Sequence, residues 1–114
     1  MNVYDTANRL AQEIRQSEEY VNFKMAQEAI GLNPELKKQV DEFDMTKYEV
    51  QISTMQTGKS DEEKNKKLQD LYVELMGKPD GKKYLEAETK FNILFADINK
   101  IIGDAVRDVF EKEN

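Results

Sequence analysis

Apolar residues recur at steps of three and four along five stretches of the chain. Such spacing places side chains on one face of an α-helix, and no alternating run of apolar and polar residues is long enough to predict a strand. The longest pattern begins at Tyr84 and continues at the same steps as far as Ala105. The sequence therefore predicts an all-α fold, an elongated bundle of about five helices with a long C-terminal helix and no β-sheet.

Residues that favour helix ends predict the bounds of the first three helices. Side-chain oxygens accept hydrogen bonds from the free amides of a first turn, and such N-caps precede the three stretches at Asn2, Ser17 and Asn33. Pro34 suits a first helical position, because its missing amide would have no partner there. Gly31 is expected to stop the second helix in a left-handed conformation, and Gly58 to end a third helix of about 24 residues.

The last two helices are also delimited by turn and cap residues. Ser60 and Glu63 have the spacing of a capping box, which predicts the start of a fourth helix that Gly77 ends. Residues 78–81 have the sequence Lys-Pro-Asp-Gly and are expected to form a turn. The fifth helix is then predicted to begin near Lys82 and to continue to about residue 112.

The predicted terminal helix has more length and more apolar surface than a small domain covers. A helix over about residues 82–112 is about 46 Å long, whereas a spherical domain of this size is about 35 Å across. Its central packing stripe is predicted to comprise Phe91, Leu94, Phe95, Ile98, Ile101 and Ile102. A second face is the candidate oligomer interface and comprises Ile93, Ala96, Gly103, Val106 and Phe110. The sequence thus predicts a homodimer or a higher oligomer.

Two small residues on the second face have two interpretations. Ala96 and Gly103 are seven residues apart, so that a partner helix could approach closely there. Alternatively, Gly103 marks a kink or a tolerated defect that costs the helix about 1 kcal/mol.

Composition narrows the chemistry further. With 114 residues, the chain suits a single domain over residues 1–114, and it contains no cysteine and no histidine. Thiolate nucleophiles, cysteine-held clusters and imidazole catalysis are therefore excluded. No metal or other cofactor is predicted, and we expect a protein that is not an enzyme.

Two motifs could be taken for binding sites. A helix end explains the first more simply, and a solvated surface explains the second. Residues 57–60 have the sequence Thr-Gly-Lys-Ser, but Ser53 stands where a phosphate-binding loop needs glycine. A helix stop followed by a helix cap explains the motif better. Paired acidic residues lie mostly off the apolar stripes, where a solvated face is a simpler explanation than a magnesium site.

Lysines form a third candidate feature, a weak RNA or partner patch. The residues concerned are Lys64, Lys66, Lys67, Lys78, Lys82 and Lys83. Residues 59–83 contain seven lysines and six acidic residues, and the whole chain has a net charge of −6. Since nucleic-acid binders need a basic surface, this balance argues against a nucleic-acid partner. No stretch approaches the about 18 apolar residues of a membrane span, so we expect a cytoplasmic protein with no membrane partner.

Several residues resemble a known family. The segments are 4–10 (Tyr-Asp-Thr-Ala-Asn-Arg-Leu), 17–20 (Ser-Glu-Glu-Tyr) and, above all, 91–102, which ends in Ile-Asn-Lys-Ile-Ile. With the order of short and long helices, they resemble the YlbF/YmcA/YheA family of small bacterial helical proteins, and most closely its cysteine-free YheA-like branch. The resemblance implies a cytoplasmic, non-catalytic helical protein that forms homo-oligomers or mixed complexes.

The resemblance also limits what can be transferred. It implies relatives that regulate competence, biofilm formation and sporulation within a complex that influences RNA processing and can carry iron–sulfur clusters. A cluster needs cysteine ligands, and this chain has none, so that property does not transfer. The leading hypothesis is a homo-oligomeric scaffold or adaptor, and the alternative is an accessory regulatory subunit of an RNA-processing or developmental complex.

Overall fold

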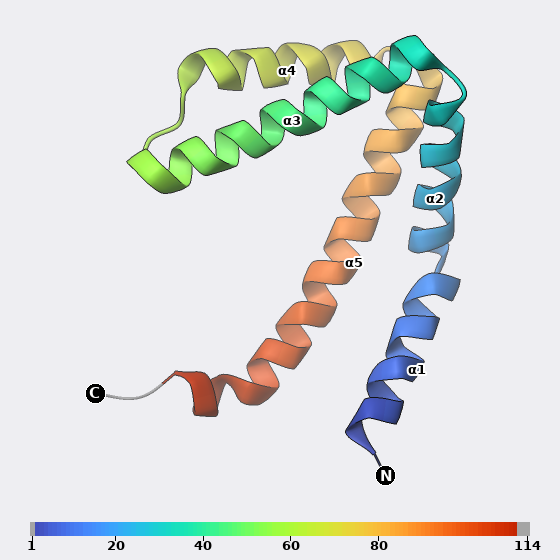
Figure 1. The fold of residues 1–114 in the computed structure, drawn as a ribbon, viewed down its shortest axis with the longest axis vertical. Helices are drawn as coiled ribbons and strands as arrows, with labels where there is room; N and C mark the ends of the chain where they lie inside the picture. The colour runs from blue at the N-terminus through green and yellow to red at the C-terminus, as the bar shows by residue number, and fades with distance from the viewer. Residues whose placement is uncertain (1, 112–114) are drawn as a thin grey trace. The chain divides into compact units, whose positions relative to one another are not determined.

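The computed structural model describes residues 2–111, which form five α-helices (Figure 1). Their bounds are α1 (Val3–Gln16), α2 (Glu18–Gly31), α3 (Pro34–Thr57), α4 (Glu62–Met76) and α5 (Pro79–Phe110). Residues 2–111 contain no strand. The prediction of an all-α protein with five helices and a long terminal helix is confirmed. The predicted end of that helix near residue 112 lies outside the described residues.

The chain divides into two compact units. Helices α2 and α5 each contribute residues to both of them. Unit 1 consists of residues 1–23 and 87–114, and unit 2 of residues 24–86. Every buried residue of the described chain lies in unit 2. These residues are Ala26, Ile30, Leu36, Val40, Phe43, Thr46, Leu75, Gly81, Tyr84 and Leu85. Unit 2 therefore contains the hydrophobic core, and the single-domain expectation stays a prediction.

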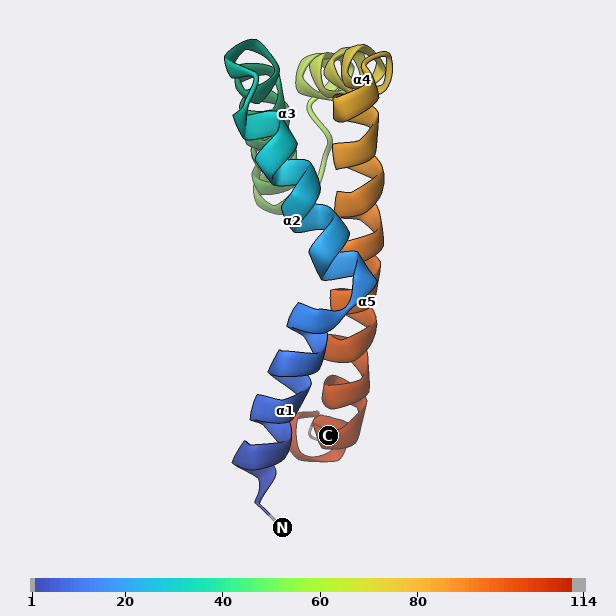
Figure 2. The same ribbon diagram turned by 90° about the vertical axis from the view of Figure 1, so that its right-hand side faces the viewer.

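Helices α3 and α4 form a closely packed hairpin in unit 2 (Figures 1 and 2). Leu75 of α4 is fully buried, and the rings of Phe43 and Tyr72 lie 6.4 Å apart between their centroids. The first part of α5 also belongs to this unit, where the hydroxyl of Tyr84 donates to Asp44 Oδ2 over 3.1 Å. Burial of these apolar side chains is the main term that stabilises unit 2.

The start of α5 differs from the prediction. Residues 78–81 do not form a separate turn, because α5 begins at Pro79 and the Lys82 amide already donates to the Lys78 carbonyl over 2.8 Å. Proline is favourable in a first helical turn, which explains the earlier start. Gly81 is buried in this turn against the backbone of Leu75, where a Cβ atom would lie 3.2 Å from the Leu75 carbonyl carbon. Glycine therefore serves close packing here and does not end a turn.

Two predicted helix ends are also corrected. Asp61 caps α4, because its side chain accepts from the amides of Glu63 and Lys64, and Ser60 does not. Gly31 does not adopt a left-handed conformation, since Gly58 alone has a positive φ (72°) among the described residues. The chain leaves α2 through shorter-range bonds, in which the Leu32 amide donates to the Ala29 carbonyl. The predicted cap at Asn33, the proline at the start of α3 and the Gly58 stop are confirmed.

Candidate interaction surface

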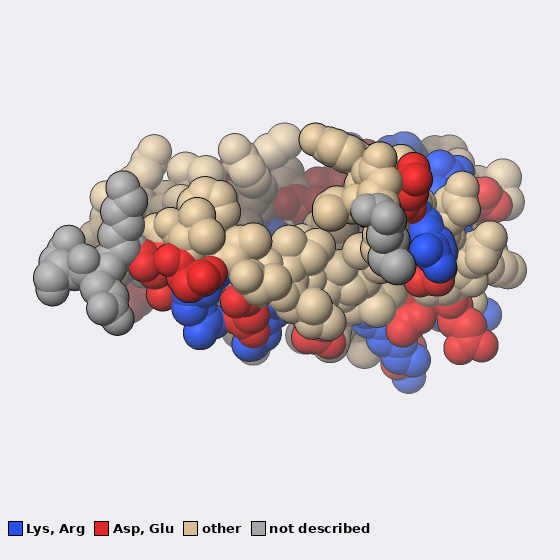
Figure 3. Space-filling view, turned by 90° about the horizontal axis from the view of Figure 1, so that it is seen from below, with Lys and Arg blue, Asp and Glu red and all other residues tan. Residues whose placement is uncertain are grey.

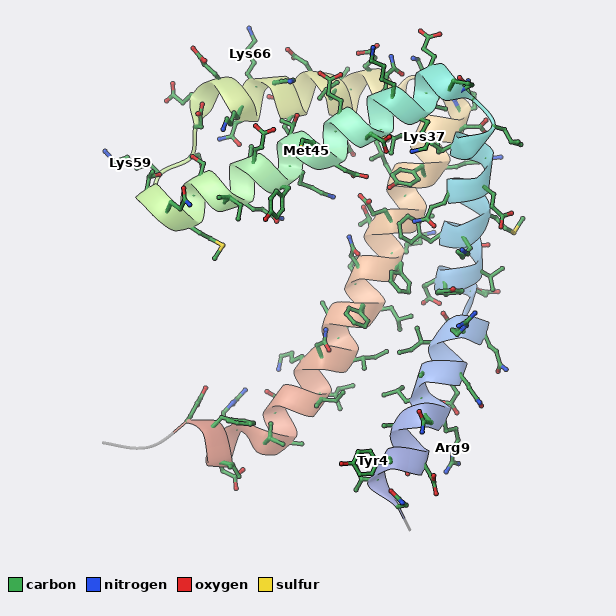
Figure 4. The ribbon with its side chains drawn as sticks, viewed as in Figure 1. Tyr4, Arg9, Lys37, Met45, Lys59 and Lys66 are labelled. Atoms are coloured by element: carbon green, nitrogen blue, oxygen red, sulfur yellow. The ribbon has the colours of Figure 1, made fainter. Side chains whose placement is uncertain are left out.

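Helix α1 leaves part of its apolar stripe uncovered. None of its side chains is buried, and Leu10 and Ile14 are only half-buried. At the start of the helix, Val3 and Tyr4 are about 80% exposed. Tyr4 and Arg9 project from opposite sides of α1 in Figure 4. The apolar side of this helix is therefore accessible to a partner.

The part of α5 that belongs to unit 1 is similarly uncovered. In the predicted packing stripe, Phe91, Leu94 and Ile98 are half-buried, whereas three further members of the stripe are exposed. The exposed members are Phe95 (47%), Ile101 (69%) and Ile102 (51%). Val109, which continues the same stripe by a further turn, is 67% exposed. This stripe packs inside the chain only near its start.

Aromatic contacts account for the packed beginning of that stripe. The Phe91 ring lies 6.0 Å from the Tyr20 ring and 5.7 Å from the Phe23 ring, measured between centroids. Phe95 stacks on Phe91 at 6.1 Å with an angle of 12° between the ring planes. Such pairs stabilise by about 0.5–1.5 kcal/mol beyond their buried area. They join the start of α2 to α5 within unit 1, and among residues 2–111 no aromatic pair of this kind involves α1.

A row of charged side chains runs along the other side of α5. Asp104 pairs with Lys100 at 2.9 Å and also with Arg107, one turn away on either side. Figure 3 shows acidic and basic side chains along the lower edge beside the C-terminal end of the chain, with uncharged side chains next to them. The helix is thus amphipathic to its end, although no apolar partner covers this end within unit 1.

The residues of the predicted second face are all exposed. Ala96, Gly103 and Phe110 follow one another at seven-residue steps and lie on one side of α5, with Val106 between them and the stripe. Ile93 lies four residues before Asp97 and seven before Lys100, on the charged side of the helix. Ala96 and Gly103 are exposed, and a Cβ atom added at Gly103 would meet no atom within 4 Å. Val106 is thus the member of this face that lies next to the stripe, Ile93 is the member nearest the charged row, and the face as an interface stays a prediction.

We define the α1–α5 surface by the large apolar side chains that unit 1 exposes on α1 and along the α5 stripe. These are Val3, Tyr4, Phe95, Ile101, Ile102, Val106, Val109 and Phe110. The sequence predicted no interface on α1. The three- and four-residue spacing of its apolar side chains indicates an apolar face, but spacing cannot show that the face is left uncovered.

The lysines of the weak RNA or partner patch do not form one free basic surface. Lys64 pairs with Glu49 at 3.5 Å and Lys67 with Glu42 at 3.3 Å, so α3 neutralises part of α4. Lys78 donates to Gln39 Oε1, whose amide nitrogen in turn donates to Glu74 over 2.8 Å. Lys66, Lys82 and Lys83 are exposed, and Lys66 projects from the side of α4 that faces away from α3 (Figure 4).

A second uncovered apolar stripe lies on α3. Met45, Tyr48 and Met55 are 60%, 60% and 81% exposed, and half-buried Ile52 lies between them. Their steps of three and four residues match one helix face.

A shallow hollow of about 390 Å³ lies elsewhere on the hairpin, lined mainly by charged side chains of α3 and α4. It has no convergent set of groups that would define a ligand.

Within residues 2–111, no three acidic side chains cluster so as to hold a metal ion. None of the helices in the same range has the apolar length that spanning a membrane requires.

Residues 2–111 thus define a small all-helical protein that exposes apolar side chains along α1 and α5. Residues 3–107 match the family described as control of competence regulator ComK, YlbF/YmcA. The chain belongs to this family, as the resemblance of its sequence implied. Assignment to the YheA-like branch stays a prediction.

Relatives of similar length support the assignment. A UPF0342 protein of Desulfitobacterium hafniense (strain Y51) is 35% identical over 96% of this chain and 88% of its own length. A UPF0342 protein of Clostridium novyi (strain NT) is 34% identical over 96% of both chains. Among solved structures, Bacillus subtilis RicA in complex with RicF has a similar fold, with a TM-score of 0.57, 20% identity and 96% of each chain covered.

Proposed function

We propose that this protein is a non-catalytic helical adaptor that forms homo-oligomers through the α1–α5 surface. The observation that carries the proposal is the absence of any buried side chain among the described residues of unit 1. Ordering those residues costs about 1–2 kcal/mol each in backbone entropy, and apolar burial is the main term that offsets such a cost. A partner that covers the surface would supply the missing burial.

The size of the surface agrees with a stable interface. The exposed fractions of its eight side chains correspond to about five whole side chains, on the order of 800 Å² at about 150–200 Å² each. A standard interface buries about 800 Å² on each partner, and the largest apolar patch of a typical monomer is about 300–600 Å². The summed exposed area of these eight residues is therefore comparable with one side of a standard interface.

A second copy of the chain suits this surface because both copies present the same apolar stripe. A two-fold contact needs a patch that complements itself, and apolar side chains do so without matched charges. The charged row beside the stripe also needs no external partner, since Asp104 already pairs with Lys100 and Arg107. Apolar contact between two copies thus leaves these ion pairs intact.

Sedimentation equilibrium at micromolar concentrations tests the proposal. We expect a dimer or higher oligomer, and Ile102→Asp is expected to weaken association at least 100-fold. The reason is that an unpaired carboxylate would enter an apolar interface at a cost of several kcal/mol. Ile93→Asp is the matched control, because Ile93 is 57% exposed on the charged side of the same helix.

A strictly monomeric wild-type protein would contradict the proposal. Equal losses of association in the two variants would instead restore Ile93 to the interface, as the sequence analysis expected. Circular dichroism of both variants would check that their helix content is unchanged.

The family and its fold favour a second candidate, an accessory subunit of a regulatory complex. A chain of similar fold comes from the structure of Bacillus subtilis RicA in complex with RicF, and the family of the present chain is described as control of competence regulator ComK. Under this proposal the α1–α5 surface would bind a different protein. Affinity purification of the tagged chain from its native cell, compared with its Ile102→Asp variant, would test it. A defined partner that the variant no longer captures would support the candidate.

Direct RNA contact by such a subunit has a separate test. Binding that weakens steeply with salt and disappears in Lys82→Glu/Lys83→Glu would support contact through the lysines. No binding at low salt would remove this version of the second candidate.

A further inference from the structure

Helix α1 is a separate helix with no core of its own. Ser17, with φ −66° and ψ 150°, interrupts the backbone between α1 and α2. The Ser17 amide and hydroxyl both donate to the carbonyl of Ile14, so they end α1 and do not continue its ladder. The same hydroxyl oxygen accepts from the Tyr20 amide at the start of α2. The 14 residues of α1 must therefore form their own helix.

The interactions within α1 provide little free energy for forming a helix of its own. Isolated helices shorter than about 12–15 residues are marginal in water, because the first turn is costly to form. Asn2 caps the helix by accepting from the Tyr4 amide over 2.8 Å, and Leu10 and Ile14 are the only half-buried side chains of α1, which has no buried one. No aromatic pair or salt bridge in the described residues links α1 to α5. The Arg15 side chain of α1 instead contacts α2, where Arg15 Cζ lies 6.0 Å from the centroid of the Tyr20 ring.

Unit 2 provides the contrast. Its hairpin contains fully buried Leu75 and the buried Val40 and Phe43, so its amides are held by a packed core. Local stability follows such burial, and segments with few buried apolar contacts open most readily. The two parts of the chain should therefore differ greatly in the free energy of local opening.

We propose that α1 exchanges between helix and coil in the single chain and becomes a fixed helix only when a second copy covers its apolar stripe. This inference rests on the proposed self-association and adds that α1 orders during assembly. The cost of ordering α1 is then part of the association free energy. Helix propensity in α1 consequently controls how tightly the protein assembles, even at positions that touch no partner.

Substitutions at Gln12 test this coupling. Gln12 is exposed and lies two residues from both Leu10 and Ile14, on the polar side of α1. Glycine and alanine differ in helix propensity by an amount that corresponds to about fivefold per chain, and hence to about 25-fold for a dimer with two α1 helices. Gln12→Gly is thus expected to dimerise about 25-fold more weakly than Gln12→Ala.

The matched control is the same pair of substitutions in unit 2. Gln51 is exposed on α3, which is packed in the single chain. Gln51→Gly and Gln51→Ala are expected to differ in resistance to urea but to dimerise with equal affinity. Sedimentation at graded concentrations gives the dissociation constants of all four variants.

Hydrogen exchange provides an independent reading of the same step. In the monomeric reference variant Ile102→Asp, the amides of residues 7–15 are expected to exchange without protection, whereas those of residues 40–46 stay protected. In the assembled wild-type protein both segments are expected to be protected.

The possible failures are distinguishable. Equal dissociation constants for Gln12→Gly and Gln12→Ala, or protected α1 amides in the Ile102→Asp monomer, would overturn this inference while leaving self-association in place. A wild-type protein that is monomeric at every concentration would overturn the proposed self-association, and this inference with it.

Discussion

Gly81 and Gly103 are glycines of the same helix, and replacing each with alanine should change stability in opposite directions. At Gly81 an added Cβ would overlap the Leu75 carbonyl oxygen and lie 3.3 Å from the Leu75 Cα. At Gly103 it would meet nothing within 4 Å. Alanine is the better helix former at both positions, so the difference between the two variants isolates the contact with Leu75.

The expected magnitudes follow from these distances. Gly103→Ala should stabilise the chain by about 0.5–1 kcal/mol, the difference in propensity between alanine and glycine in an exposed helix. Gly81→Ala gains a similar amount but forces two backbone segments apart, and overpacking costs about 1–3 kcal/mol. Leu75 is fully buried, so its backbone has little room to move, which favours the upper end of that range. We expect a net loss of about 2 kcal/mol.

Urea unfolding, followed by far-ultraviolet circular dichroism at one protein concentration, measures both changes. The midpoint should fall for Gly81→Ala and rise for Gly103→Ala, with similar slopes. A Gly81→Ala variant as stable as the wild type would refute the close approach of α5 to Leu75. Sedimentation of Gly103→Ala also measures its self-association. Weaker association than in the wild type would mean that a partner helix approaches Gly103 closely.

Three further predictions concern unit 2. Leu75→Ala should lower the free energy of unfolding by about 2–5 kcal/mol through loss of burial and a remaining cavity, as measured by urea unfolding. Because Asp61 caps α4, Asp61→Ala should lower the free energy of unfolding by about 0.5–2 kcal/mol and Ser60→Ala by only a few tenths, in the same assay. A larger loss for Ser60→Ala would mean that Ser60 is the cap. Lys67→Ala should cost less than about 1 kcal/mol because its pair with Glu42 is exposed, and a larger loss in 0.5 M salt than in low salt would contradict this explanation.

Most helix bounds were predictable because their signals are local. The start of α3 at Asn33 and Pro34 and its end at Gly58 were both predicted and are confirmed. These signals act through hydrogen bonds and backbone angles within a few residues. Ser60 was a plausible cap by spacing, but Asp61 accepts from two amides and takes the role. Neighbouring candidates of similar chemistry cannot be ranked without the backbone path.

The candidate surface was predictable only in part. The spacing of Phe91, Ile98 and Ile102 identified a helix face, and aromatic contacts of Tyr20 and Phe23 with Phe91 decide where that face is covered. The spacing could not show that Ile102 and most of the following turns stay exposed. Coverage depends on side chains more than sixty residues away, and periodicity contains no information about them.

The sequence by itself determined that the chain forms five helices, where most of them begin and end, and which side of each is apolar. Those properties depend on interactions between residues within one or two turns of one another. Only the tertiary structure decided that burial is concentrated in unit 2, that Gly81 permits contact with Leu75, and that α1 and the end of α5 lack a cover. The physical reason is that an amphipathic pattern shows which face favours burial, whereas burial itself requires atoms from another part of the chain or from a partner.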